Sequence, residues 1–175
     1  MKLYSVTQVL SPYVDFSKAK PEDVEAGGIR GTDVHRLSFG IARGLWCPIP
    51  PEYEGYIQSF QKVLEVVDKI VAIEPELVDE DLGFVGHPDF IWQMRGVSGL
   101  TIPDLKTSTN EGPTWCGQMA AYKHLAIKHH YDVKQVISVR LQADGKRPRI
   151  KEYTDSARDL QAFLGALTAY RYFKP

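Results

Sequence analysis

The strongest constraint on the fold is a pair of strand-forming segments separated by a turn-forming stretch. Phe84-Val85-Gly86 and Phe90-Ile91-Trp92 are rich in residues that favour strands. Leu100–Lys106 alternates apolar and polar residues, as a half-buried strand does. Between Phe90-Ile91-Trp92 and Leu100–Lys106, the stretch Gly96-Val97-Ser98-Gly99 is typical of a turn. The sequence therefore predicts a hairpin, and with it a sheet, in the middle of the chain.

Three of the charged residues on this predicted hairpin are candidates for a functional site. Asp89 ends one apolar run, and Asp104 and Lys106 point to one face of the other strand because side chains repeat every second residue. If the register makes Asp89 and Asp104 neighbours, the two carboxylates repel each other unless a cation lies between them. An isolated Asp-X-Lys is more often a solvated strand end. The combination is what a metal-dependent phosphodiesterase needs, with acids that hold a divalent cation and a lysine beside it.

Further motifs surround the hairpin in a fixed order. Gly86-His87-Pro88-Asp89 is followed by Asp104-Leu105-Lys106-Thr107, and then by Gln118 and Tyr122, which share one face of a predicted helix. Upstream stands Gly31-Thr32-Asp33-Val34-His35. The order Gly-X-X-Asp, Asp-X-Lys-Thr, Gln-X-X-X-Tyr resembles the PD-(D/E)XK nuclease superfamily, in particular its RecB-type exonuclease branch, which often carries Gly-Thr-X-X-His upstream. The match covers over half of the chain.

The resemblance implies a metal site. By it, Asp89 and Asp104 would bind Mg²⁺ or Mn²⁺, with the carbonyl oxygen of Leu105 completing the coordination. His35 and Glu74 would be additional ligands. From the residues alone, a single histidine on a helix is more often a partly buried polar group than a ligand.

The resemblance also implies the remaining roles. Lys106 would be the catalytic lysine, and Gln118 and Tyr122 would orient it or contact the DNA backbone. The chain departs from the pattern at His87, where the branch more often has a small residue. Glu76 competes with Glu74 for the acidic position, because both would lie on one face of the same strand.

The hydrophobic pattern predicts the remaining elements. In chain order they are a short apolar opening at Tyr4–Leu10, helical turns at Pro21–Ala26 stopped by Gly27-Gly28, a helix from Thr32 to about Arg43, a helix at Glu52–Ile70, strands at Val71–Val78, Gly83–Met94 and Leu100–Lys106, a helix at Thr114–His130, strands at Val133–Gln142 and Arg149–Tyr153, and a helix at Asp155–Tyr172. We expect an α/β protein with a restriction-endonuclease-like αβββαβ core at about residues 31–154. Its central mixed sheet would be flanked by helices, with extra helices at the N-terminus.

Composition sets the class of protein. A length of 175 residues with 43% hydrophobic and 25% charged content predicts a single soluble domain over residues 1–175. Two cysteines are too few for the four-cysteine iron–sulfur clusters of some relatives of this branch, and they indicate a reducing compartment. No apolar run approaches the ~20 residues of a membrane helix. We expect a cytoplasmic protein, or one of the host cytoplasm if a phage encodes it.

The charge balance neither requires nor excludes a nucleic-acid partner. The net charge is −1, so any phosphate contact would need a local basic patch. Cationic residues late in the chain could form a DNA-facing rim, although a charged hairpin is usually soluble surface. They are Lys128, Lys134, Arg140, Lys146, Arg147 and Arg149. Trp115 could stack on a base or cap the edge of the core.

The sequence thus predicts a metal-dependent DNA exonuclease of the kind found in phages or in DNA recombination and repair. A metal-activated water would attack the phosphodiester, with Lys106 orienting or deprotonating it. The substrate would be single-stranded DNA or duplex ends. Alternatives are a structure-selective endonuclease, a nuclease subunit working with a helicase or recombinase, or an inactive nucleic-acid-binding module. A homo-oligomer is compatible with each.

Overall fold

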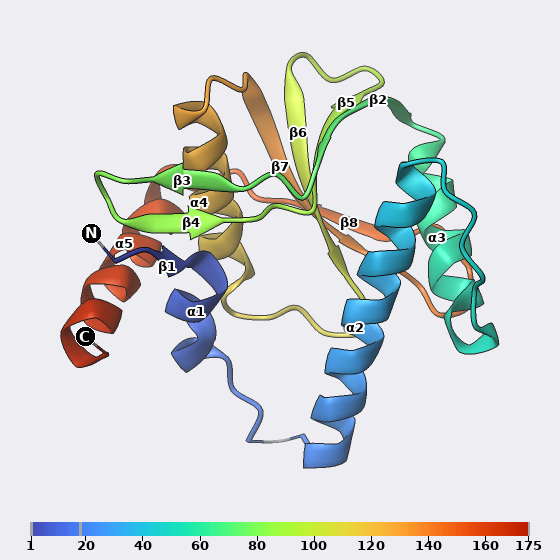
Figure 1. Ribbon diagram of the computed structural model, residues 1–175, viewed down its shortest axis with the longest axis horizontal. Helices are drawn as coiled ribbons and strands as arrows, with labels where there is room; N and C mark the ends of the chain where they lie inside the picture. The colour runs from blue at the N-terminus through green and yellow to red at the C-terminus, as the bar shows by residue number, and fades with distance from the viewer. Residues whose placement is uncertain (1, 18, 175) are drawn as a thin grey trace.

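The computed structural model describes residues 2–17 and 19–174. Its centre is a five-stranded mixed sheet in the order β2-β5-β6-β7-β8, with helices on both faces (Figure 1). The strands of this sheet are β2 (Val67–Ile73), β5 (Phe90–Met94), β6 (Leu100–Lys106), β7 (Val133–Arg140) and β8 (Arg149–Glu152). A second sheet contains β1 (Tyr4–Ser5), β4 (Phe84–Gly86) and β3 (Leu77–Asp79) in the order β1-β4-β3.

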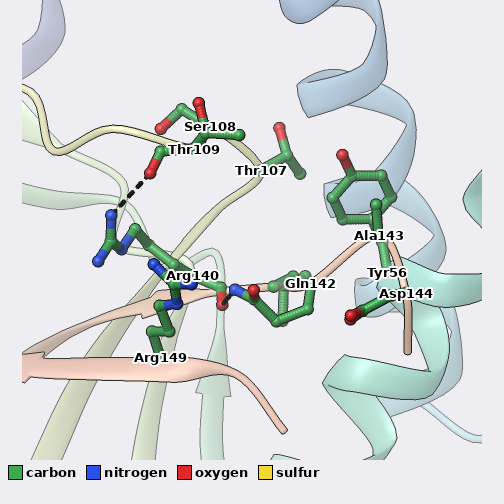
Figure 2. Close-up of a pocket in the computed structure, with 10 residues that line it drawn as sticks. Tyr56, Thr107, Ser108, Thr109, Arg140, Gln142, Ala143, Asp144 and Arg149 are labelled. Carbon is green, nitrogen blue, oxygen red and sulfur yellow. Dashed lines mark hydrogen bonds between the residues drawn. The ribbon is translucent and has the colours of Figure 1, made fainter. Parts of the chain in front are cut away.

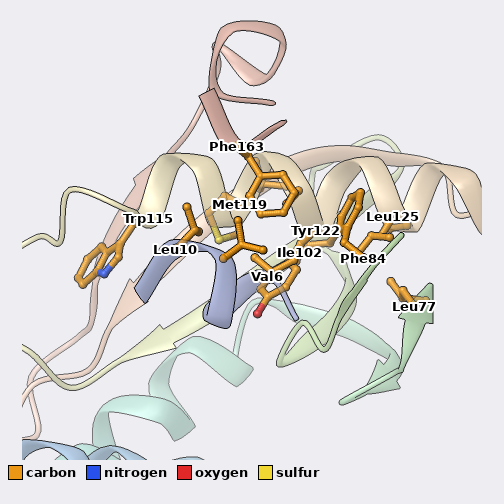
Figure 3. Packing of buried hydrophobic residues seen from close by; sticks show 14 of the residues in the cluster. Val6, Leu10, Leu77, Phe84, Ile102, Trp115, Met119, Tyr122, Leu125 and Phe163 are labelled. Atoms are coloured by element: carbon orange, nitrogen blue, oxygen red, sulfur yellow. The ribbon is translucent and has the colours of Figure 1, made fainter. Parts of the chain in front are cut away.

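The helices divide between the two faces of the central sheet. Helices α1 (Val6–Leu10), α4 (Trp115–Lys128) and α5 (Ser156–Phe173) contribute to one apolar cluster, which includes Ile102 of β6 (Figure 3). Helices α2 (Pro21–Ala42) and α3 (Glu54–Leu64) contribute to the other, which includes Leu105. Short 3₁₀ turns lie at Ser11–Tyr13 and Pro51–Tyr53. Because β6 alternates, its even-numbered residues face α4 and Leu105 faces α2 and α3.

The predicted hairpin is confirmed. Strands β5 and β6 pair antiparallel, with Trp92 opposite Thr101, and the turn between them places Gly96 and Gly99 at positive φ. Glycine suits these positions because it has no Cβ to clash there. Strand β6 then continues through α4 into the parallel strand β7, and β7 pairs antiparallel with β8.

The predicted stop at Gly27-Gly28 is wrong, because α2 is one helix from Pro21 to Ala42. Both glycines lie within regular helix, and the Thr32 hydroxyl donates to the carbonyl of Gly28 instead of capping a new helix. Two glycines weaken a helix by about 1 kcal/mol each relative to alanine. Neither takes the left-handed conformation that would end it, and the second half is held by buried side chains such as Val34 and Leu37.

Two predicted strands have the wrong extent. The stretch predicted as Val71–Val78 contains the end of β2 at Ile73 and then β3, which belongs to the other sheet. The stretch predicted as Gly83–Met94 likewise splits into β4 and β5. Helix α3 ends at Leu64, whereas the predicted helix ran to Ile70. Val67 matches the apolar spacing of the helix, yet it begins β2.

The C-terminal half follows the sequence pattern closely. Helix α4 at Trp115–Lys128 and strands β7 and β8 lie within the predicted ranges. Asp155 caps α5, since its side chain accepts a hydrogen bond from the backbone N–H of Arg158. Among the described helices, none is both long and apolar enough to cross a membrane.

Candidate functional site

The candidate site is centred on the last residues of β6. Asp104 is 2% exposed and points toward α4 from the middle of the sheet. The Nζ atom of Lys106, two residues further on, lies 2.5 Å from Oδ2 of Asp104. The ammonium also lies over the ring of Trp115, 5.2 Å from its centre. Period-two alternation of the strand therefore brings an acid and an amine together in a buried position, as the sequence predicts.

Helix α4 fixes the orientation of this pair through Gln118. Its side-chain oxygen accepts a hydrogen bond from Lys106 Nζ at 3.1 Å, and its Nε2 donates to Oδ1 of Asp104 at 3.1 Å. The same Nε2 lies 3.2 Å from the hydroxyl of Tyr122, one helical turn along. Burial and the charge of Asp104 raise the pKa of Tyr122, so the phenol stays protonated. Gln118 therefore bridges the lysine and the acid, which are also in direct contact.

Asp89 approaches β6 from the start of β5. Trp92 pairs with Thr101 in this antiparallel hairpin. Asp89 lies three residues before Trp92 and Asp104 three residues after Thr101, so the two acids come opposite each other. Instead of a backbone pair, the Oδ2 atom of Asp89 accepts a hydrogen bond from the N–H of Leu105 at 2.6 Å. Asp89 is 8% exposed. The two carboxylates therefore share one buried end of the hairpin.

The electrostatics of this end are unfavourable for two ionised acids. Burial raises the pKa of Asp89 above its ordinary value, and the charge of Asp104 raises it further. His35, the hydrogen bond from Leu105 and Lys106 act in the opposite direction but do not outweigh burial. One Oδ atom of Asp104, Oδ2, is buried and accepts no hydrogen bond of good geometry despite the nearby ammonium.

His35 reaches the same place from α2. Its Nε2 lies 2.9 Å from the carbonyl oxygen of Leu105 and 3.7 Å from Oδ2 of Asp89. A carbonyl accepts only, so Nε2 carries the proton in this contact. His35 and the Leu105 carbonyl, both predicted as ligands, therefore form a hydrogen bond with each other.

Glu74 is not brought into this group. It follows the end of β2 at φ 49°, and its carboxylate lies 3.6 Å from Arg43. Its backbone N–H donates to the carbonyl of Asp89. Glu76, which is not on a strand either, pairs with His87 at 3.2 Å. Across residues 2–17 and 19–174, no three His, Cys, Asp or Glu side chains are grouped as a metal site.

Gly86 explains how α4 comes close to β4, the strand that precedes the hairpin. A Cβ atom at this position would lie 2.6 Å from Cδ1 of Leu125 and 2.9 Å from the ring of Tyr122. Only glycine leaves room for this approach of helix to strand. The glycine of the Gly-X-X-Asp motif thus has a packing role that positions Tyr122, and through it Gln118.

Sequence reasoning missed a polar extension of the site across the sheet. Ser138 of β7 lies beside Asp104 in the register, and its hydroxyl is 3.2 Å from that of Tyr153. Burial raises the pKa of Tyr153 to about 12, with Ser138 opposing and Glu111 adding to the effect. Ser138 could have been found as the polar residue within the apolar run Val136–Val139 of β7.

Comparison with known proteins gives a likeness of fold. No family model matches the chain, and no curated protein matches it. Among solved structures, a protein from Eubacterium rectale described as a "putative exonuclease" superimposes with a TM-score of 0.50 at 13% sequence identity. The alignment covers 84% of this chain and 65% of the other.

At this identity the likeness concerns the fold alone. This chain spans less than two thirds of the length of the Eubacterium rectale protein. The comparison therefore supports an α/β fold with a mixed sheet flanked by helices.

Proposed function

We propose that this protein is a metal-dependent DNA exonuclease of the PD-(D/E)XK superfamily, in its RecB-type branch, with the αβββαβ core of that superfamily. The observation that carries the proposal is the convergence of Asp89, Asp104 and Lys106 at one buried end of the β5–β6 hairpin. Gln118 joins the acid and the amine. Burying charges is costly, so a set of this kind is retained most readily where chemistry uses it.

The residues present fit a hard divalent cation. Asp89, Asp104 and the carbonyl of Leu105 offer only oxygen atoms, and Mg²⁺ binds through one or two carboxylates while keeping several waters. Two buried carboxylates face a single lysine here, and burial raises the pKa of Asp89, so the acids outnumber the cation that the site itself supplies. The set offers no sulfur and one nitrogen, from His35, whereas zinc sites are typically built from several Cys and His ligands. We infer Mg²⁺ or Mn²⁺, held by Asp89, Asp104 and the Leu105 carbonyl, with His35 beside it.

Such an ion would polarise a phosphate oxygen and lower the pKa of water. The protein's own contribution is the position of Lys106. Its ammonium has three donors, of which Asp104 and Gln118 direct two. The third is free to donate to an oxygen of the substrate phosphate or to orient the attacking water. Trp115 covers the ammonium and limits its exposure to solvent.

The fold comparison adds independent support for a nuclease. The structurally similar Eubacterium rectale protein carries an exonuclease description. Its sequence is only 13% identical, so the roles of individual residues here rest on the geometry of this chain.

The test is cleavage of DNA by the purified protein with Mn²⁺ or Mg²⁺. Linear duplex, single strands and closed circular DNA are incubated with the wild-type protein and with Asp104→Asn. We expect linear DNA to be degraded by the wild type, and the rate to fall by at least about 10²-fold in the variant. Asp132→Asn is the matched control, because Asp132 is an exposed acid paired with Lys134.

The pattern of products separates the alternatives. Nicking of closed circles would identify an endonuclease, and binding without cleavage would identify a nucleic-acid-binding module. Full activity in Asp104→Asn would remove the site assignment altogether. Chelation of the metal should abolish cleavage and be reversed by adding Mn²⁺.

A further inference from the structure

A pocket opens immediately beyond Lys106, at the carboxyl end of β6. It has a volume of about 280 Å³ and lies between the loop after β6, the facing ends of β7 and β8, and Tyr56 of α3. Figure 2 shows Arg140 and Arg149 on one side of it and Tyr56 on the opposite side. The loop contributes Thr107, Ser108 and Thr109.

The sheet register places three cations in one row at this end. Lys106 is opposite Arg140 on the parallel strand β7, and Arg140 is opposite Arg149 on the antiparallel strand β8. Residues opposite each other in a sheet project from the same face. Since neighbouring strands lie about 4.8 Å apart, the row runs from the candidate active site into the pocket over roughly 10 Å.

The two arginines differ from the other cations of this region in their partners. Lys134, Lys146 and Arg147 each form an ion pair with an acid, as Lys128 does with two. Within residues 2–17 and 19–174, neither Arg140 nor Arg149 has a carboxylate within ion-pairing distance. Asp144, the acid that lines the pocket, is already paired with Lys146 at 2.6 Å.

Like charges directly opposite each other in a sheet are destabilising. Arg140 relieves part of this by donating to the carbonyl of Thr109 at 2.9 Å, which also ties the loop to β7. Arg149 has no comparable contact within the described chain. A guanidinium pair that shares one pocket with the Thr107 hydroxyl suits an oxyanion, because arginine binds phosphate through two parallel N–H groups.

Building on the proposed nuclease function, we propose that Arg140 and Arg149 form a phosphate-binding subsite that holds a second phosphate of the strand whose scissile phosphate lies at Lys106. The row of cations then follows the backbone of the bound strand out of the active site. Either an internal phosphate or a terminal 5′-phosphate supplies the same chemistry. This subsite binds substrate and touches no reacting atom.

The experiment compares Arg149→Gln with Arg147→Gln. Both replace an arginine of the β7–β8 region by the same residue, but Arg147 pairs with Glu65 outside the pocket. Binding of a fluorescent single-stranded oligonucleotide, with and without a 5′-phosphate, is measured in EDTA at several salt concentrations. Steady-state cleavage is measured in Mn²⁺. Arg140→Gln serves as a second variant, with folding checked by circular dichroism.

For Arg149→Gln we expect binding to weaken several-fold and the salt dependence of log Kd to fall by about 0.7, the amount for one contact to a single-stranded phosphate. KM should rise while kcat stays unchanged, since binding alone is lost. A loss seen only with the 5′-phosphorylated strand assigns the terminal phosphate; an equal loss with both strands assigns an internal one. Equal behaviour of Arg149→Gln and Arg147→Gln overturns the subsite.

The outcomes for the two proposals are distinct. If cleavage depends on Asp104 but Arg149→Gln binds and cleaves DNA like the wild type, the subsite is wrong and the proposed nuclease function stands. A wild-type protein that cleaves no DNA under any of these conditions removes the nuclease, and the subsite falls with it.

Discussion

Two buried clusters of this protein use the same side-chain types and solve the same electrostatic problem differently. The β6 cluster consists of Asp89, Asp104 and Lys106, with His35 and Gln118. The β3 cluster consists of Asp79 at the end of β3, with His124 and Lys128 of α4. In each, an aspartate only 2% exposed faces a lysine, and a histidine lies nearby.

The difference lies in the balance of donors and acceptors. Asp79 is one carboxylate with three donors, namely His124 at 2.7 Å, Lys128 at 2.8 Å and the N–H of Leu82 at 2.9 Å. Burial alone would raise its pKa, but these contacts lower it to about 2. The β6 cluster holds two carboxylates, and there the pKa of Asp89 is raised. The β3 cluster is complete in itself, whereas the β6 cluster has room for further positive charge.

The comparison teaches that residue type does not separate a structural ion cluster from a functional one. Both clusters contain Asp, His and Lys, both contact α4, and the central aspartate of each is buried. The count of buried acids against donors distinguishes them, because Asp81, the second acid on Lys128, is exposed to solvent. If this distinction holds, matched substitutions in the two clusters should have opposite consequences for activity and stability.

The largest contrast is expected from the two lysines. Lys106→Gln should lower the cleavage rate by about 10²-fold or more, because it removes the donor beside Asp104 that acts on the substrate. Lys128→Gln should leave the rate within about twofold, since Lys128 only pairs with Asp79 and Asp81. Steady-state cleavage of linear DNA measures both. Equal losses would erase the distinction between the clusters.

Stability should respond in the opposite sense. Asp79→Asn should lower the free energy of unfolding by about 2 kcal/mol, because it leaves buried donors without their charged acceptor. Asp104→Asn should leave it unchanged or raise it, because one of two repelling carboxylates is removed. Urea denaturation of the variants and the wild type gives the values. A large loss in Asp104→Asn would show that this acid is structural as well.

The pH dependence of the stability loss in Asp79→Asn tests whether the charge of Asp79 causes that loss. The pKa of Asp79 is depressed in the folded protein from 3.8 to about 2, so its stabilising effect is present above 3.8. It is lost as the pH falls through about 2. The gap between wild type and Asp79→Asn should therefore be constant near neutral pH and narrow below pH 4. A gap that stays constant down to pH 2.5 would point to packing instead of charge.

The smallest effect is expected at Glu74. Its carboxylate faces Arg43 on the surface, so Glu74→Gln should change the free energy of unfolding by less than about 0.5 kcal/mol. Cleavage should stay within about twofold of the wild type. Loss of activity comparable to that of Asp104→Asn would bring Glu74 back into the site as a ligand.

How far the sequence could predict these features depends on the range of the interactions involved. Strand alternation is local, so it placed Asp104 and Lys106 on one face and Gln118 with Tyr122 on one side of a helix. The glycine turn predicted the hairpin but left its register open, and the pairing of Trp92 with Thr101 supplies it. The position of Gln118 between Lys106 and Asp104 needed the packing of α4 on Gly86, which no local pattern encodes.

The errors have the same explanation. Gly27-Gly28 looked like a helix end, but buried residues further along hold α2 together. The split of the predicted central strands into two sheets depends on the pairing of β4 with β1, at the other end of the chain. The role of Glu74 as a ligand stays a prediction; its backbone turns at φ 49° after Ile73, and its carboxylate lies 3.6 Å from Arg43. Ser138 and the Arg140–Arg149 pair become neighbours of the site only through strand pairing.

The pairing of β1 with β4 also bears on the order in which the molecule assembles during translation. Tyr4 pairs with Phe84, and Val6, Val9 and Leu10 pack in the cluster that includes Met119 and Phe163. These residues are synthesised long before their partners in β4, α4 and α5. Their apolar side chains cannot be fully buried until α5 has been synthesised. Strands β5 and β6 are joined by a short turn, so they can pair soon after both have been synthesised. The β5–β6 hairpin can therefore pair before the N-terminal residues reach their partners in α5.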